Sequence, residues 1–161
     1  MTTTPSQNNT LILFGTQTGT AEDLAEQLSE SFSGCGITNR LENMFDVDMK
    51  LVKTFKRLII IVSTWGDGDP PDDGEALHLE FSESSNTEFS GIDFAVFGLG
   101  DTGYEQFCQC GIDFDTFLEK GGGNRLLTRV NADMDFDEEF DTWADTLTEL
   151  LTQDQLQQVS A

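Results

Sequence analysis

The residues best suited to bind a ligand lie in three short loops, each rich in glycine and each directly after an apolar run. The first loop, residues 15–21, places hydroxyl groups and glycines just before a helical pattern: Gly15, Thr16, Gln17, Thr18, Gly19, Thr20 and Ala21. Backbone N–H groups at a helix N-terminus, together with the helix dipole, bind anions such as phosphate. No lysine follows the second glycine, so the loop is not the Walker A motif of a nucleoside triphosphate site. The alternative explanation is that its hydroxyl groups only cap the helix.

The second and third loops each carry one large aromatic residue. Residues 63–72 read STWGDGDPPD and include Trp65, while residues 98–108 read GLGDTGYEQFC and include Tyr104, the only tyrosine. Two aromatic rings on neighbouring loops can enclose one planar ligand, and Gly66 allows the peptide beside Trp65 to change conformation. A turn with an incidental core tryptophan, and a tyrosine that only stabilises its own loop, are the alternatives without a ligand.

The segments that must position these loops alternate between strand and helix patterns. Apolar runs predict strands at residues 11–14, 37–43, 58–62, 94–97 and 126–130. Helical spacing of apolar residues predicts helices at residues 21–32, 48–55, 75–84, 107–118 and 140–151. This alternation predicts an α/β fold with a parallel sheet, in which ligands bind beyond the carboxyl ends of the strands. The three loops, which follow the first, third and fourth strands, are therefore expected at one edge.

Composition limits the partners and the compartment. The 161 residues carry a net charge of −22, which opposes binding to nucleic acid and to anionic membranes. The longest apolar run, residues 58–62, is too short to cross a bilayer, and the N-terminus lacks a secretory signal pattern. Three cysteines without metal-like spacing fit a reducing compartment. We therefore expect a cytoplasmic monomer with one domain over residues 10–152 and flexible termini at residues 1–9 and 153–161.

Acidic residues form two runs, one after the second loop and one near the C-terminus. The runs contain Asp67, Asp69, Asp72, Asp73 and Glu75, and then Asp133, Asp135, Asp137, Glu138, Glu139 and Asp141. Negative charge at the ligand edge would steer a basic partner into brief, salt-sensitive encounters and would disfavour a negatively charged reduced cofactor. Adaptation to salt is the alternative, because Glu26 and Glu30 lie away from these loops.

The remaining reactive side chains indicate structural roles. Cys108 and Cys110 have a spacing that points their side chains apart on a helix, so they are expected to be small buried residues, neither a disulfide nor a metal pair. His78 is expected at the surface and Trp143 in the core. Because the chain has one histidine, a multi-histidine metal site is excluded. No metal ligand and no catalytic residue is predicted.

Several of these motifs, taken in order, resemble one known family. The chain resembles the flavodoxin-like FMN domain of diflavin reductases, and most of all that of the sulfite reductase flavoprotein. The segments that carry the resemblance are TQTGTA, STWGDGDPPDD, FGLGDTGYEQFC and GGGNRLLTRVNADMDF. The resemblance runs from about Leu11 to Leu151. It implies a three-layer, doubly wound fold whose five-stranded parallel sheet has the order 2-1-3-4-5. As is known for flavodoxin, it also implies noncovalent FMN at the switch point between the first and third strands.

The resemblance also implies roles for individual residues. The phosphate loop matches Thr16, Gln17, Thr18, Gly19, Thr20 and Ala21. The segment against one face of the flavin ring matches Ser63, Thr64, Trp65 and Gly66, and the carbonyl of Gly66 accepts a hydrogen bond from N5–H of the reduced ring. The segment against the other face matches Leu99, Gly100, Asp101, Thr102, Gly103, Tyr104, Phe107 and Cys108. Asp133 matches an acidic position that some relatives place beside the cofactor.

These observations predict an electron carrier that shuttles single electrons through FMN. The implied partners are basic redox proteins, such as a flavin-containing NADPH reductase as donor and a haem or iron–sulfur protein as acceptor. One alternative is an FMN-dependent NAD(P)H or quinone oxidoreductase, and another is the FMN domain of a sulfite-reductase-type diflavin reductase. A signalling receiver domain is disfavoured, because Thr16 and Ser63 stand where receivers need acidic residues.

Overall fold

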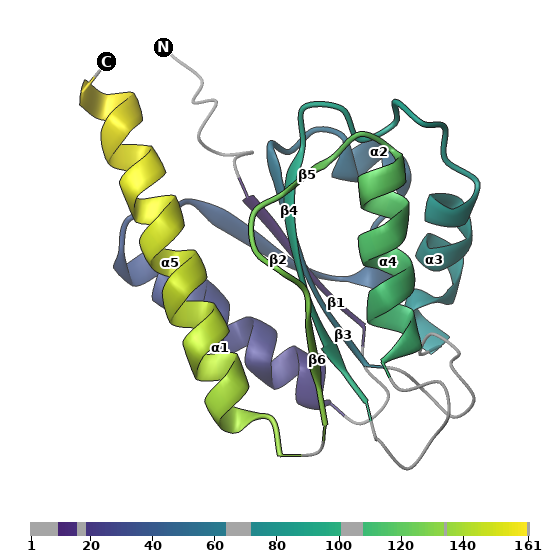
Figure 1. Cartoon of the computed structure of the whole chain (residues 1–161), viewed down its shortest axis with the longest axis horizontal. Helices are drawn as coiled ribbons and strands as arrows, with labels where there is room; N and C mark the ends of the chain where they lie inside the picture. Colours follow the sequence, from purple (N-terminus) through teal and green to yellow (C-terminus); the bar gives the residue numbers. More distant parts are fainter. Residues whose placement is uncertain (1–9, 16–18, 64–71, 101–107, 134, 161) are drawn as a thin grey trace.

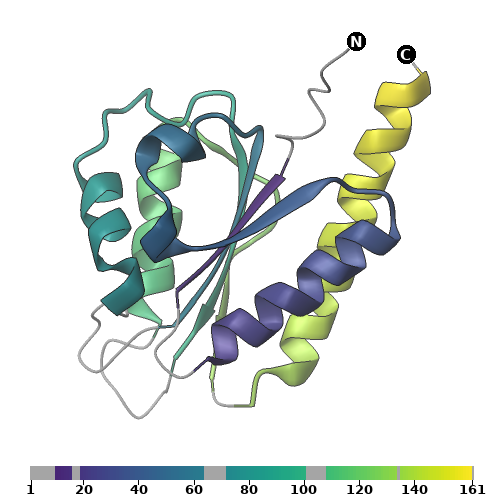
Figure 2. The same ribbon diagram turned by 180° about the vertical axis from the view of Figure 1, so that it is seen from behind.

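The chain folds into three layers, with a twisted parallel sheet between two groups of helices (Figures 1 and 2). A computed structural model describes residues 10–15, 19–63, 72–100, 108–133 and 135–160, and it describes side chains as far as residue 153. Everything below refers to these residues. The layered architecture confirms the predicted doubly wound α/β fold.

The sheet has the predicted strand order. Its strands are β1 (Thr10–Gly15), β2 (Asn39–Asn43), β3 (Arg57–Ser63), β4 (Asp93–Leu99), β5 (Asn124–Arg125) and β6 (Val130–Ala132). The order is β2-β1-β3-β4-β5, β6 also pairs with β4, and every described pairing is parallel. Strand order reverses between β1 and β3, which is the switch point that the sequence predicts.

The fifth strand position differs from the prediction of one strand over residues 126–130. Two short strands fill it instead, with Arg125 opposite Phe94 and Val130 opposite Phe97. Between these two pairings the segment advances by five residues, from Arg125 to Val130, while β4 advances by three, from Phe94 to Phe97. Two extra residues therefore bulge out of the ladder. The arginines on either side of the bulge, Arg125 and Arg129, both donate to Asp115 on the helix over residues 109–120, and these bonds hold the bulged segment in place.

Helices cover both faces of the sheet. On one face lie α1 (Thr20–Gly34) and α5 (Asp137–Ser160). On the other lie α2 (Met49–Val52), α3 (Glu75–Ser82) and α4 (Gln109–Lys120), with the short 3₁₀ turns η2 (Met44–Asp46) and η3 (Asp72–Gly74). The last helix continues past residue 152 to Ser160, into the glutamine-rich end. The domain limits 10–152 remain a prediction.

The central strands are apolar on both faces because each face packs against helices. Along β3, Ile59 and Ile61 join the core on the α1 and α5 side, while Leu58, Ile60 and Val62 join the core on the α3 and α4 side. All five are fully buried. Full burial of one such side chain is worth about 1.5–3 kcal/mol, so this continuous run fixes β3 at the centre of the sheet.

Candidate cofactor site

The strands that precede the three predicted loops are neighbours and end together. In the parallel ladder, Gly15 lies opposite Val62, and Ser63 lies opposite Leu99. The hydroxyl of Ser63 donates a long hydrogen bond of 3.5 Å to the carbonyl of Gly15. The carboxyl ends of these strands therefore lie at one side of the sheet, the lower one in Figure 1, which we call the carboxyl edge. This confirms the expected placement of the three strand ends.

The predicted cofactor residues fall into two groups. Eight are described and lie at this edge or in the helix turns that follow it: Gly19, Thr20, Ala21, Ser63, Leu99, Gly100, Cys108 and Asp133. The others lie outside the described residues: Thr16, Gln17, Thr18, Thr64, Trp65, Gly66, Asp101, Thr102, Gly103, Tyr104 and Phe107. The enclosure of a ring between Trp65 and Tyr104 therefore stays a prediction.

The first turn of α1 forms a backbone cradle at the carboxyl edge. Gly19 precedes the helix with a φ of +93°, which glycine adopts without strain, and its carbonyl accepts the N–H of Asp23 at 3.1 Å. A Cβ added to Gly19 would meet no described atom within 4 Å. Ala21 is fully buried and anchors the turn to the core. The positive end of a 15-residue helix beside a residue without a side chain fits an anionic phosphate group.

The two ends of the third loop are held together at the sheet. The N–H of Gly100 donates to the carbonyl of Ala132 at 2.9 Å, which ties the end of β4 to β6. A Cβ on Gly100 would lie 2.8 Å from the backbone nitrogen of Cys108, so only glycine fits this close approach. Cys108 itself has a φ of +54°, and its thiol lies 3.5 Å from the carbonyls of Gly98 and Ala132. Residues 100 and 108 thus form a rigid base for the loop between them.

Cys108 is buried and unreactive in character. Burial and the nearby carboxylate of Asp133 raise the pKa of the Cys108 thiol to about 12, so the thiol is neutral at physiological pH. Burial also raises the pKa of Cys110, and both cysteines are free. The prediction that Cys108 and Cys110 are small buried residues is confirmed.

Opposite charges lie close to this base. Asp133 directly follows β6, and its charge raises the pKa of Cys108, whereas the charge of Arg129 lowers that pKa. The guanidinium of Arg129 donates to Asp115 at 2.7 Å and to the side-chain oxygen of Asn131 at 3.0 Å. We did not predict this cluster from the sequence. Its acidic residues belong to α4 and its arginines to the segment that follows α4, so no local spacing indicates that they pair.

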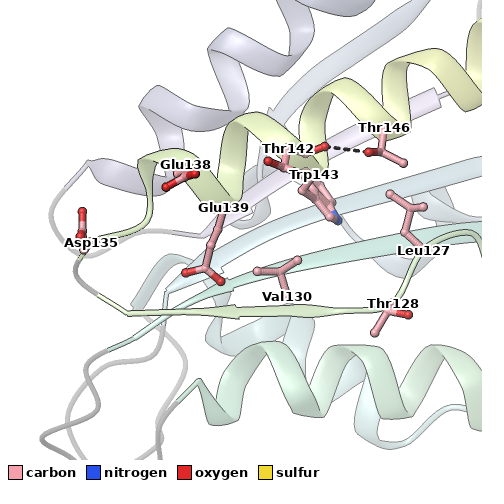
Figure 3. A pocket seen from close by; sticks show the side chains of 9 residues that line it. All are labelled: Leu127, Thr128, Val130, Asp135, Glu138, Glu139, Thr142, Trp143 and Thr146. Carbon is pink, nitrogen blue, oxygen red and sulfur yellow. Dashed lines mark hydrogen bonds between the residues drawn. The ribbon is translucent and has the colours of Figure 1, made fainter.

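A hollow of about 680 Å³ lies beside the carboxyl edge, between α5 and the segment 127–130 (Figure 3). It is lined by Leu127, Thr128, Val130, Asp135, Glu138, Glu139, Thr142, Trp143 and Thr146. Trp143 is 4% exposed, as predicted for a core residue, but its ring N–H has no hydrogen-bond partner among the described residues. Figure 3 shows that nitrogen turned away from the helix toward the 127–130 segment. The acidic side chains at the rim are exposed.

His78 lies partly inside the protein, so its prediction as a surface residue was wrong. Its Nε2 lies 2.9 Å from the Asp113 carboxylate, and its ring meets the edges or faces of Phe114 and Phe117. The cause is the packing of α3 on α4, which a helical pattern taken by itself does not specify. Among the described residues, no acidic, histidine and cysteine side chains cluster as metal ligands, and no helix is long and apolar enough to cross a membrane.

Comparison with known proteins supports the sequence resemblance. The family model described as flavodoxin matches residues 12–143. The chain is 40% identical over 149 residues to the sulfite reductase [NADPH] flavoprotein alpha-component of Photorhabdus laumondii, covering 92% of this chain and 25% of that protein. It is 39% identical to the component of the same name from Cronobacter sakazakii, covering 87% and 23%. The chain therefore spans about a quarter of the length of these relatives.

Solved structures show the same fold. The flavodoxin of Streptococcus pneumoniae TIGR4 superposes with a TM-score of 0.77 at 24% identity, covering 87% of this chain and 94% of that one. Oxidised Flavodoxin 2 from Bacillus cereus superposes with a TM-score of 0.73 at 25% identity, covering 88% and 98%. Nearly the whole of each compared structure is therefore matched by this chain.

Proposed function

Because this chain belongs to the flavodoxin family, we propose that it binds FMN noncovalently at the carboxyl edge and carries single electrons between two redox proteins. The observation that carries the proposal is the meeting of three strand ends, each followed by a ligand-binding motif, at the switch point of a parallel sheet. FMN, when bound, supplies the redox chemistry. The protein binds the cofactor, orients it and tunes its electronics.

We assign the binding and tuning of FMN to different residues according to their positions at the carboxyl edge. The first turn of α1, with Gly19 and the hydroxyl of Thr20, is suited to the phosphate group, since a neutral backbone cradle holds an anion without a lysine. Trp65 and Tyr104 are proposed to cover the two ring faces and to exclude water. The carbonyl of Gly66 is proposed to accept a hydrogen bond from the reduced ring. Cys108 takes no part in the chemistry and fixes the base of its loop.

The charge of the carboxyl edge supports a basic redox protein as partner. Exposed Asp72 lies in η3 and exposed Glu75 begins α3, while exposed Asp135 precedes α5 and exposed Glu138 and Glu139 lie in its first turn. Such a field accelerates encounters with a basic surface and keeps the complex short-lived. We propose a flavin-containing NADPH reductase as donor, a haem or iron–sulfur protein as acceptor, and a monomer working in the cytoplasm.

A second candidate function is the FMN domain of a longer diflavin reductase. The observation that favours it is the identity of about 40% to sulfite reductase flavoproteins, of which this chain spans a quarter. In that setting electrons would arrive from a domain joined to the same protein. Mixing the FMN-loaded chain with isolated FAD- and NADPH-binding domains of such a reductase separates the two. Electron uptake only when the domains are covalently joined would favour the second candidate.

Titration of the apoprotein with FMN tests the proposed function directly. We expect one FMN per chain, with quenching of flavin fluorescence. Tyr104→Ala should raise the dissociation constant about tenfold or more, because an aromatic stacking partner is lost, while Tyr104→Phe keeps the ring and should bind nearly as tightly as the wild type. A folded apoprotein that binds no FMN at saturating concentration would overturn the proposal.

Stopped-flow experiments test the carrier role. NADPH alone should leave the flavin oxidised, because covered ring faces give the nicotinamide no place to stack. Rapid bleaching by NADPH would instead favour an NAD(P)H oxidoreductase. Reduction through a basic NADPH reductase should slow steeply as salt rises, and a rate independent of ionic strength would contradict electrostatic steering.

A further inference from the structure

We propose that Arg129, held in position by Asp115, is a cation that stabilises reduced FMN on the Asp133 side of the site. This inference rests on the proposed function, because it concerns the same carboxyl edge. It adds a tuning residue that lies outside the three loops. The proposal follows from the bulge between β5 and β6 and from the ion pairs that this bulge makes possible.

The position of Arg129 is fixed from two sides. Its Nη1 donates to Oδ2 of Asp115 at 2.7 Å, and its Nε donates to the side-chain oxygen of Asn131 at 3.0 Å. Asp115 is almost fully buried on α4, whereas Asn131 belongs to β6. A guanidinium held by charge-assisted bonds to two different elements has little freedom to move. Arg129 therefore presents its charge from a defined place.

That place is next to the base of the third loop. Val130 pairs with Phe97 near the end of β4, and Ala132 accepts the N–H of Gly100 where the loop begins. Asn131, which accepts from Arg129, lies opposite Gly98, and the carbonyl of Gly98 lies 3.5 Å from the thiol of Cys108, where the loop ends. In agreement with this position, the charge of Arg129 lowers the pKa of that thiol. Asp133 and Glu139 act on it with the opposite sign.

The sign of the effect follows from the charge of the whole protein. With a net charge of −22 and acidic groups on both flanks, the carboxyl edge disfavours added negative charge. A fixed cation near that edge offsets part of the penalty when the flavin gains electrons. Removing the cation should therefore weaken the binding of reduced FMN more than the binding of oxidised FMN, which lowers the reduction potential of the bound cofactor.

The structure contains a distant control for this charge in Arg40. Arg125 cannot serve, because its Nη2 and the Nη1 of Arg129 both donate to Oδ2 of Asp115 at 2.7 Å, so the two charges lie close together. Arg40 belongs to β2 on the other side of the sheet, lies opposite Leu11 near the start of β1, and pairs with Glu42. Arg40→Gln and Arg129→Gln thus remove the same charge at two distances from the carboxyl end of β4.

The experiment measures the potentials of bound FMN by redox titration, together with the dissociation constants of oxidised and reduced FMN. For Arg129→Gln we expect the affinity for reduced FMN to fall about threefold to tenfold more than the affinity for oxidised FMN. Arg129→Lys should restore most of this difference because it keeps the charge. Arg40→Gln, which removes a distant charge, should leave the difference at the wild-type value. Urea unfolding of each variant measures the loss of stability separately.

Each outcome decides between distinct conclusions. If Arg129→Gln lowers stability but leaves the affinity ratio unchanged, or if Arg40→Gln shifts that ratio equally, the inference is wrong and the role of Arg129 is structural. If a wild-type apoprotein that unfolds cooperatively binds no FMN at all, the proposed function fails and this inference fails with it. Normal FMN binding with an unchanged ratio overturns the inference alone.

Discussion

The two edges of the central sheet are closed by different means. At the amino edge, where the parallel strands begin, side chains join neighbouring strands: the guanidinium of buried Arg57 donates to the hydroxyl of buried Thr10 at 3.1 Å, and Asn124 donates to Asp93 at 3.1 Å. At the carboxyl edge the chain enters α1 and α4 through Gly19 and Cys108, both with positive φ, and Ser63 makes only a long bond of 3.5 Å to Gly15. Glycines with positive φ also lie in the turns of the amino edge, at residues 36, 91 and 122, so the two edges differ in their side-chain hydrogen bonds and not in their turns.

This difference indicates which edge contributes to the stability of the fold and which edge binds the cofactor. A helix N-terminus can bind a ligand only if its N–H groups point into an open space and no bulky side chain fills that space. The amino edge has no such demand and can use its polar groups for internal bonds. We therefore expect substitutions at the amino edge to change the free energy of unfolding and leave FMN binding intact, and substitutions at the carboxyl edge to change FMN binding more.

The largest effect is expected for Gly100→Val. The added Cβ would lie 2.8 Å from the nitrogen of Cys108 and 3.0 Å from its sulfur, so the base of the third loop must shift. Overpacking of this kind costs about 1–3 kcal/mol, and a displaced loop should raise the FMN dissociation constant at least tenfold. The matched control is Gly34→Ala at the end of α1, where a Cβ meets no described atom within 4 Å. Equal FMN affinities in the two variants would show that the carboxyl edge tolerates movement.

Asp115→Ala comes next and tests the side chain that binds the arginines on either side of the bulge. Its removal leaves the guanidinium groups of Arg125 and Arg129 without their shared acceptor. Breaking a buried pair is costly, but both arginines are partly exposed, so we expect a loss of about 2 kcal/mol in urea unfolding. Glu119→Gln is the control, because Glu119 is 61% exposed and should change stability by less than about 0.5 kcal/mol. A loss no greater than that of the control would mean that the bulge is held by packing alone.

Thr10→Val has a smaller effect and isolates the amino edge. Valine keeps the shape of threonine but removes the acceptor of the buried bond from Arg57. We expect the free energy of unfolding to fall by about 1 kcal/mol, with the FMN dissociation constant unchanged. Ser63→Ala is the counterpart at the carboxyl edge. Its bond to Gly15 is long at 3.5 Å, so stability should barely change. Weaker FMN binding by Thr10→Val would contradict the separation of the two edges.

The elements that the sequence predicts best are those whose signal is local and apolar. The runs at residues 58–62 and 94–97 become β3 and β4 with ends extended by one or two residues, because a fully covered strand needs a continuous apolar run. The helix predicted at residues 107–118 becomes α4, which ends at Lys120, directly before three glycines. The order of the motifs along the chain then indicates the fold family and the edge of the sheet at which the cofactor site lies.

The features that the sequence does not predict depend on partners distant along the chain. The fifth strand splits because Arg125 and Arg129 reach Asp115 on another element, and no local pattern of residues 126–130 contains that bond. His78 is drawn inward by Phe114 and Phe117 for the same reason. Such tertiary pairings override local propensity, and they place a cation next to a site that the motifs alone describe as acidic.

The last effect is absent at neutral pH, appears only in alkaline solution, and concerns Cys108. Its pKa in the folded protein is about 12, above the ordinary thiol value near 9, so the unfolded state loses this proton first as pH rises. Stability is therefore unaffected below about pH 9 and falls between about pH 9 and 12, by at most about 1.4 kcal/mol per pH unit for one thiol. Urea unfolding across this range should show a shallower fall for Cys108→Ala, whereas Cys35→Ala, which changes an exposed thiol, should follow the wild type. An identical pH dependence in Cys108→Ala would mean that the thiol ionises without unfolding, and that the carboxyl edge is open to water at its base.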